Sequence, residues 1–200
     1  MTGFEHLLRA GEANMNRTIQ ILDRDQMNST LERLAYEVLE QHLRHFDLAL
    51  VGIQRRGVHL ARRIQAHLQH RLGEEVPLGK LDINLYRDDW TRIKSQPRIN
   101  STDIGFSVDG RNILLVDDVI FTGRTTRAGL EAVLDFGRPE RVELLTLIDR
   151  GHRELPIHPD YTGKRVNTAR REQVDVMVQE LDERDEVLLT TKEEDPGENG

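Results

Sequence analysis

Residues 113–126, ILLVDDVIFTGRTT, decide the fold of this 200-residue chain and hold its most informative chemistry. The apolar run 113–116 predicts a strand buried on both faces, as in parallel sheets that are covered by helices. Asp117 and Asp118 follow that strand, and a short loop then leads into a helix expected over 125–136. In open α/β sheets, ligands bind beyond the carboxyl ends of the strands, so we expect a binding site here.

The flanking sequence alternates between strand-like and helix-like patterns. Strands are expected at 18–22 (an edge strand), 48–52, 81–85, 113–116, 142–148, around 174–181 and at 186–191. Apolar residues spaced three and four apart predict helices at 31–43, with Asn28 or Ser29 as cap, and at 60–68. Strands that alternate with helices predict an α/β fold with a mostly parallel, doubly wound sheet.

Composition narrows the classes of protein. Two hundred residues fit one domain with a full core. The absence of cysteine excludes a disulfide framework, thiolate metal sites and cysteine nucleophiles. No apolar run approaches the roughly 20 residues of a membrane helix, and the first residues lack the apolar centre of a signal peptide, so we expect a cytoplasmic protein with no membrane partner.

The sequence predicts one domain between two less regular ends. Residues 1–16 show no period and are expected to be a loose extension, 17–191 to be the domain, and 192–200 to be a disordered acidic tail. The net charge of −7 argues mildly against nucleic-acid binding. A basic cluster nevertheless stands at Lys164, Arg165, Arg170 and Arg171, and both a solvated loop and a phosphate-binding patch remain open for it.

The segment 117–126 joins two carboxylates to a loop suited to phosphate. Hydroxyls and backbone N–H groups of Thr122, Gly123 and Thr125 would meet at a helix N-terminus, whose dipole favours phosphate. The carboxylates would repel phosphate, but they suit the hydroxyls of a ribose or a Mg²⁺ ion. Either half alone is compatible with a plain strand end or a helix cap, whereas together they predict a site for ribose 5-phosphate.

This stretch resembles the 5-phosphoribosyl-1-diphosphate (PRPP) signature of type I phosphoribosyltransferases. More narrowly, VGIQRRG (51–57), DINLYRDD (82–89), DFGRPERVELLTLIDRGHRELPI (135–157) and DYTGK (160–164) resemble the PyrR family, which attenuates pyrimidine operons and is also a uracil phosphoribosyltransferase. The resemblance covers about residues 17–190. It implies a type I phosphoribosyltransferase-like fold, conversion of uracil and PRPP to UMP and diphosphate, Mg²⁺ as cofactor, and a homodimer or higher homo-oligomer.

The resemblance also implies roles for single residues. Asp117, Asp118 and Arg56 would be catalytic, with the two aspartates holding Mg²⁺ directly or through water. Arg87 would begin a flexible hood, 87–103, over PRPP, and Arg150 and Val174 would line the base pocket. The residues that would bind PRPP or nucleotide are Arg55, Arg56, Arg87, Asp117, Asp118, Val119, Ile120, Phe121, Thr122, Gly123, Arg124, Thr125 and Thr126.

A second implied activity is binding of the leader mRNA of a pyrimidine operon in response to UMP or UTP. The RNA contacts would be Arg33, His152, Arg153 and Lys164. This chain departs from the RNA-binding members at three positions, where Glu32 replaces threonine, Tyr36 replaces histidine and His158 replaces arginine. Two alternatives therefore stay open: an enzyme or nucleotide sensor of this fold without RNA binding, and a phosphoribosyltransferase for another base, such as a purine.

Overall fold

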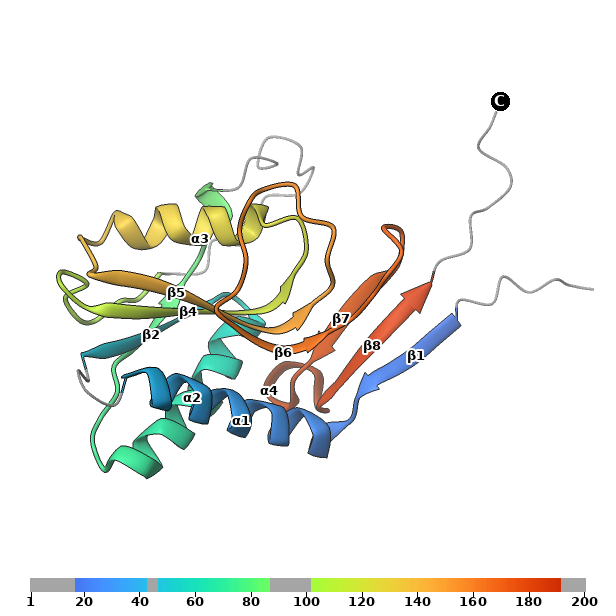
Figure 1. The fold of residues 1–200 in the computed structure, drawn as a ribbon, viewed down its shortest axis with the longest axis horizontal. Helices are drawn as coiled ribbons and strands as arrows, with labels where there is room; N and C mark the ends of the chain where they lie inside the picture. Colours follow the sequence, from blue (N-terminus) through green and yellow to red (C-terminus); the bar gives the residue numbers. More distant parts are fainter. Residues whose placement is uncertain (1–16, 43–46, 87–101, 192–200) are drawn as a thin grey trace, which may run out of the picture.

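The computed structural model describes residues 17–42, 47–86 and 102–191. In this part of the chain, five strands form a parallel sheet of order β3-β2-β4-β5-β6, and three form a separate antiparallel sheet of order β1-β8-β7 (Figure 1). The strands are β1 Arg17–Leu22, β2 Leu48–Ile53, β3 Leu78–Leu81, β4 Asn112–Ile120, β5 Arg141–Asp149, β6 Tyr161–Arg165, β7 Gln173–Met177 and β8 Glu186–Thr191. The helices are α1 Arg24–His42, α2 Arg56–Leu72, α3 Arg124–Leu134, α4 Gln179–Asp182 and the 3-10 turn η1 Asn84–Tyr86.

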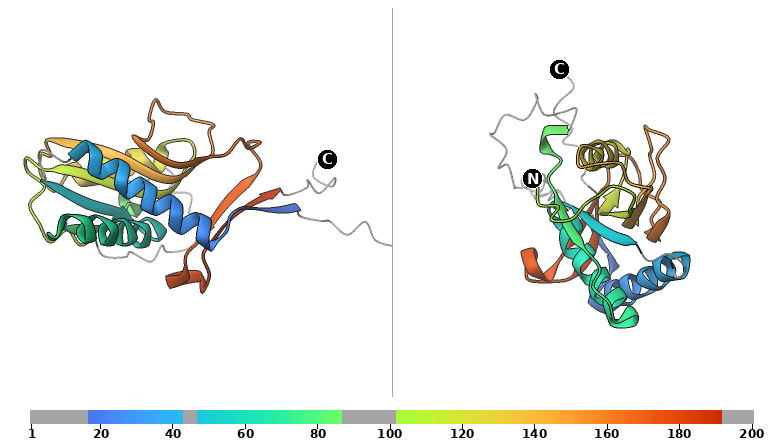
Figure 2. Two further views of the ribbon diagram at one scale, coloured as in Figure 1. Left: turned by 60° about the horizontal axis from the view of Figure 1, so that its bottom comes forward. Right: turned by 90° about the vertical axis from the view of Figure 1, so that its left-hand side faces the viewer.

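Helices cover both faces of the parallel sheet. Leu114 and Val116 of β4 lie in the core that contains the buried residues of α1 and α2, whereas Ile113 and Leu115 lie in the core that contains those of α3. The three layers are visible in Figure 2, where α3 and the α1–α2 pair lie on opposite sides of the sheet. The predicted doubly wound α/β fold is confirmed.

The antiparallel sheet lies at one end of the molecule and was not expected as a separate unit. Strand β1 pairs with β8, so that Arg17 lies opposite Thr191 and the two ends of the domain project together (Figures 1 and 2). The expected edge position of β1 is confirmed. The strand predicted around 174–181 ends at Met177, because the chain turns there into the short helix α4.

Other boundaries also differ from the prediction. Helix α1 begins at Arg24 and not near 31, because Asp23 and Gln26 cap it reciprocally, each side chain accepting the other's backbone N–H at 2.8 and 3.1 Å. The strand predicted at 81–85 is wrong in position: β3 ends at Leu81, and the turn η1 occupies Asn84–Tyr86. Strand β4 does not end at Val116, because its pairing with β5 continues as far as Ile120. Lys164 and Arg165 lie on a strand and not in a loop.

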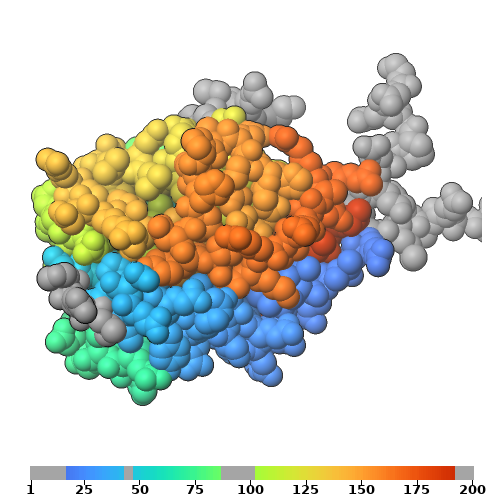
Figure 3. Space-filling model, in the orientation of Figure 1, coloured from blue at the N-terminus to red at the C-terminus, as the bar shows by residue number. Residues whose placement is uncertain are grey.

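Three predicted segments, 1–16, 192–200 and almost all of the hood 87–103, lie outside the described residues. In the part of the chain that is described, no helix is long and apolar enough to cross a membrane. The space-filling view shows α1, in blue, packed along the orange segments that follow β5 (Figure 3). Helix α1 contacts β6 in particular, which brings residues near 33 close to residues near 163.

Candidate active site

Three parallel strands end at the same edge of the main sheet, and polar segments follow each of them. Strand β2 leads into residues 54–57, β4 into residues 121–123, and β5 into residues 150–157. Because the strands are adjacent and parallel, these segments lie next to one another. Predicted site residues from three distant segments, 55–56, 117–126 and 150, therefore lie along this edge.

Asp117 and Asp118 form the carboxylate part of the edge. Asp117 is 4% exposed, and its Oδ1 accepts the backbone N–H of Asp118 at 3.0 Å. Its Oδ2 is buried and has no hydrogen-bond partner among the described residues. Burial, and then the charge of Asp118, raises the pKa of Asp117 well above its usual value. A hydroxyl or a cation brought by a ligand would satisfy this oxygen, which fits a sugar or metal site.

Asp118 lies between the buried aspartate and a positive charge. Its side chain is partly exposed, and burial raises its pKa, while a hydrogen bond with Asp117 and the charge of Arg56 act in the opposite direction. Strand β4 holds both aspartates, so their backbone is fixed by the pairing with β5. The backbone that carries the two carboxylates is therefore fixed before any ligand binds.

The phosphate-type loop, residues 121–123, lies beside the carboxylates and leads into α3. Gly123 precedes the helix with a φ of 90°, a left-handed conformation that favours glycine. The hydroxyl of Thr122 accepts the backbone N–H of Arg124 at 3.3 Å. Thr122 and Thr125 are half-buried, whereas Thr126 is buried and its hydroxyl lacks a partner among the residues described. The amino end of α3 thus offers N–H groups and a positive dipole to an anion.

Close backbone contacts around the turn after β2 leave room only for glycine at two positions. A Cβ on Gly57 would lie 2.5 Å from the carbonyl oxygen of Val116, and one on Gly52 would lie 2.5 Å from the Cα of Val58. The first turn of α2 therefore packs directly against β4, with the Gln54–Arg55 peptide in the cis form. This packing places Arg56 near Asp118.

The two arginines of this turn differ in their surroundings. Arg55 is exposed. The guanidinium of Arg56 is partly buried and donates to both carboxylate oxygens of Asp182, at 3.3 Å from Nε and 3.0 Å from Nη2. Asp182 belongs to the antiparallel part of the molecule and was not among the predicted site residues. No local pattern marks it, because its partner lies 126 residues away in the sequence.

Arg150, directly after β5, lies beside the aromatic rings of Phe121 and His152 at this end of the sheet. Its guanidinium carbon lies 4.0 Å from the centre of the Phe121 ring, and Nη2 donates to the carbonyls of Ala169 and Arg170 at 3.4 and 3.3 Å. The His152 ring meets Phe121 edge-on at 5.8 Å. Val174, the other predicted base-pocket residue, lies on β7 within the core under α1 and α2. Arg150 therefore lies beside Phe121 of the phosphate-type loop, and Val174 is buried in that core.

Arg153 holds the phosphate-type loop through its backbone. Its guanidinium donates to the carbonyls of Phe121 at 2.9 Å and Ile157 at 3.0 Å, and it pairs with Asp149 at 2.8 Å. The side chain is 13% exposed. Beside it, the backbone N–H groups of Glu154 and Leu155 donate to the carbonyl of Thr122. Sequence reasoning assigned Arg153 to RNA and missed this supporting contact, because the loop that it holds is distant in the sequence.

Part of the predicted basic cluster lies near this loop. Glu154 pairs with both Arg124, at 2.8 Å, and Arg170. Its hydrogen bond to Arg124 lowers the pKa of the carboxyl group. All three side chains are accessible to solvent, so this group is a charged surface next to the amino end of α3.

The remaining residues predicted for RNA contact their own chain. Arg33 donates to the carbonyl of Gly163 at 2.6 Å and pairs with Glu37, and Lys164 donates to the carbonyl of Ile21 at 3.0 Å. Together these two cations mark the junction of α1 with β6. His152 Nε2 lies 2.6 Å from the carbonyl of Thr168, and its ring contacts Phe121. Arg87 lies outside the described residues.

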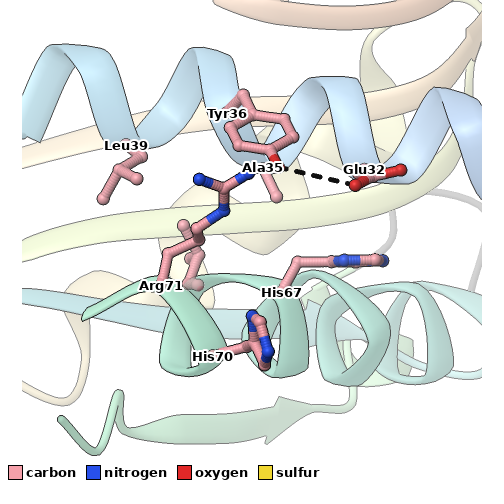
Figure 4. Close-up of a pocket in the computed structure, with 8 residues that line it drawn as sticks. Glu32, Ala35, Tyr36, Leu39, His67, His70 and Arg71 are labelled. Carbon is pink, nitrogen blue, oxygen red and sulfur yellow. Dashed lines mark hydrogen bonds between the residues drawn. The ribbon is translucent and has the colours of Figure 1, made fainter. Parts of the chain in front are cut away.

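A pocket between α1 and α2 is lined by Glu32 and Tyr36, two of the three residues expected to depart from RNA-binding members. The guanidinium carbon of Arg71 lies 4.4 Å from the centre of the Tyr36 ring, and Nη2 donates to the Tyr36 hydroxyl (Figure 4). That hydroxyl donates in turn to Glu32 at 3.5 Å. His67 and His70 complete the polar lining. Tyr36 therefore contacts α2 across the pocket, Glu32 accepts from Tyr36 on the same helix, and His158 is exposed elsewhere.

Comparisons with known proteins show the family. The family described as "Phosphoribosyl transferase domain" matches residues 18–181. "Bifunctional protein PyrR" of Pelotomaculum thermopropionicum is 51% identical over 170 residues, which cover 85% of this chain and 94% of that protein. The protein of the same name from Caldicellulosiruptor bescii is 50% identical over 175 residues, or 88% of this chain and 96% of that protein.

Solved structures show the same fold at low identity. The hypoxanthine phosphoribosyltransferase of Trypanosoma cruzi aligns with a TM-score of 0.63 at 13% identity, covering 87% of this chain and 97% of that one. A hypoxanthine phosphoribosyltransferase of Staphylococcus aureus aligns with a TM-score of 0.61 at 19% identity, covering 88% and 92%. At these identities the likeness concerns the fold alone.

Proposed function

We propose that this chain, which belongs to the phosphoribosyltransferase family and, within it, to the PyrR group, transfers the phosphoribosyl group of PRPP to uracil. The products are UMP and diphosphate. The observation that carries the proposal is the order of groups along one sheet edge. The amino end of α3 suits the 5-phosphate, Asp117 and Asp118 suit the ribose, and Arg55 and Arg56 suit the diphosphate.

In the reaction, a ring nitrogen of uracil forms a bond to the anomeric carbon and loses its proton, while the bond from that carbon to diphosphate breaks. Positive charge grows on the sugar and negative charge on the leaving group. The protein's contribution is positioning and electrostatic stabilisation, and no covalent nucleophile is needed. Arg56 offsets the charge on the leaving diphosphate, and the aspartates orient the sugar. Arg150 and Phe121 lie where the base would bind.

A magnesium ion fits the residues present. The described residues hold no group of three or more histidines or carboxylates that could bind a metal on its own. Magnesium, however, is usually held by one or two carboxylates together with substrate phosphates and water, so Asp117 and Asp118 suffice. The orphaned Oδ2 of Asp117 is consistent with that role. When bound with PRPP, the ion would neutralise charge on the diphosphate oxygens.

We further propose that the chain binds the leader mRNA of a pyrimidine operon when UMP or UTP is bound, as a homodimer or higher oligomer in the cytoplasm. Its relatives carry a name that states two functions. Arg33 and Lys164 supply positive charge at the junction of α1 with β6, and a second copy would double it. Phosphate contacts of this kind make RNA binding strongly salt-dependent.

The test of the enzyme uses radiolabelled bases with PRPP and Mg²⁺. Uracil should give labelled UMP, and hypoxanthine and guanine should give no product. A purine nucleotide as the main product would overturn the choice of base and favour the purine alternative. For the regulator, filter binding to the chain's own operon leader should weaken steeply with salt and tighten with UMP. Binding that is indifferent to UMP would leave an enzyme without this control.

A further inference from the structure

We propose that Asp182 is a positioning residue that holds the Arg56 guanidinium in place for the diphosphate group; this rests on the proposed function. Nε and Nη2 of Arg56 donate to the two carboxylate oxygens of Asp182 at 3.3 and 3.0 Å. A two-point contact fixes the plane of a guanidinium as well as its position. Asp182 engages one side of the group, so the donors of Nη1 remain available to an anion.

Asp182 is itself held rigidly. Its Oδ2 accepts the backbone N–H of Val178 at 2.9 Å, which closes the short helix α4 on itself. Burial would raise the pKa of this carboxyl group, but the hydrogen bonds from Val178 and Arg56 outweigh it and lower the pKa. The carboxylate is therefore ionised at neutral pH and paired at two points. Such a group can orient an arginine without moving when the ligand binds.

A second set of contacts anchors the segment that carries Asp182. Arg63, two turns after Arg56 on α2, donates to both oxygens of Glu180 at 3.1 and 2.7 Å and to Asp185 at 2.7 Å. Asp185 also accepts the backbone N–H of Gln179 at 2.8 Å. The connection from β7 to β8 is thus clamped onto α2 beside the end of the main sheet (Figure 1). Through this clamp the antiparallel sheet brings a carboxylate to the site.

Positioning is needed because another anion is near Arg56. Asp118 is close enough for the charge of Arg56 to lower its pKa. If Arg56 turned to Asp118, it would neutralise a group proposed to hold the sugar or the metal. Arginine also has many rotamers, and a ligand that must freeze one binds more weakly than a ligand that meets a fixed one. Asp182 therefore separates the positive end of the site from the negative centre.

The experiment compares Asp182→Asn, Asp182→Ala and Asp182→Glu with the exposed neighbour Glu183→Gln as control. We measure kcat, the KM values for PRPP and uracil, and inhibition by diphosphate. The first two variants should raise the KM for PRPP and weaken diphosphate inhibition by about fivefold to tenfold, with the KM for uracil unchanged. Asp182→Glu should recover part of the loss, and Glu183→Gln should match the wild type.

Several results would overturn the proposal. Tighter diphosphate inhibition in Asp182→Ala would mean that Asp182 masks Arg56 and does not position it. A defect that disappears at high Mg²⁺ would make Asp182 a cation ligand. Unchanged KM and inhibition constants would mean that Asp182 has no positioning role. Diphosphate binding can also be measured by calorimetry, which needs no turnover. It therefore tests the role of Arg56 even if the wild type does not convert uracil. That failure would count against the proposed function alone. The near-isosteric Asp182→Asn covers the case in which the alanine variant does not fold.

Discussion

Arg56, at the amino end of α2, and the cations at the junction of α1 with β6 are held in different ways. Arg56 is oriented by the Asp182 carboxylate at the edge of the main sheet. Arg33 and Lys164 instead donate to backbone carbonyls of their own chain and so connect α1 with β6 and β6 with β1. The first arrangement prepares a cation for a ligand, whereas the second uses cations to join elements. The proposed enzyme site is therefore better organised for a ligand than the proposed RNA-binding surface.

The largest effects should come from the charges of the enzyme site. Asp118→Asn and Arg56→Ala should each lower turnover at least about tenfold, because each removes a charge aimed at the reacting groups. Initial rates of UMP formation at saturating PRPP measure this. Near-normal turnover in both variants would mean that this edge is not the active site. Arg56 would then not differ in function from the cations at the junction of α1 with β6.

The close approach of α2 to β4 can be broken at one glycine. Gly57→Ala should lower the free energy of unfolding by about 1–3 kcal/mol and weaken PRPP binding, because the added Cβ would lie 2.5 Å from the Val116 carbonyl. Gly105→Ala is the matched control, since a Cβ there meets nothing within 4 Å. Urea unfolding of both variants checks the prediction, and equal stabilities would show that the turn can move without cost.

Asp117→Asn should separate activity from stability. The folded pKa of Asp117 lies above its unfolded value, so its stabilising effect is full below the unfolded pKa and is lost as the pH rises through the folded pKa. Replacing it should therefore raise the melting temperature by at least about 2 °C at neutral pH, while activity falls. The gain should shrink as the pH falls towards 4. Thermal unfolding across this pH range gives the result, and a gain independent of pH would contradict it.

Much of the parallel sheet could be predicted from the sequence, and the antiparallel sheet only in part. The run 113–116 is apolar without interruption because β4 is buried on both faces, and that pattern is local. The pairing of β1 with β8 joins the two ends of the domain, so no local pattern contains it. The strand-to-helix change after Met177 was missed for a related reason: α4 is held by Arg63, which lies far away on α2.

The site divides in the same way. Asp117, Asp118 and the loop before α3 are contiguous and chemically distinctive, so their sequence predicted a sugar-phosphate site. Asp182 and the supporting role of Arg153 depend on contacts between distant segments. The sequence also could not reveal that Tyr36 interacts with Arg71 across the α1–α2 pocket. Residue types predict chemistry, but the partners that orient those residues follow only from the fold.

The smallest catalytic effect is expected at Arg33. Arg33→Gln should leave UMP formation within about twofold of the wild type and change stability by at most about 1 kcal/mol, because its pair with Glu37 is exposed. If the junction of α1 with β6 contacts RNA phosphates, the same change should lower the slope of log affinity against log salt by about 1. Arg138→Gln makes the same charge change in an exposed loop and should leave the slope unaltered. Equal slopes in the two variants would mean that Arg33 only joins α1 to β6, and RNA binding would then need another surface.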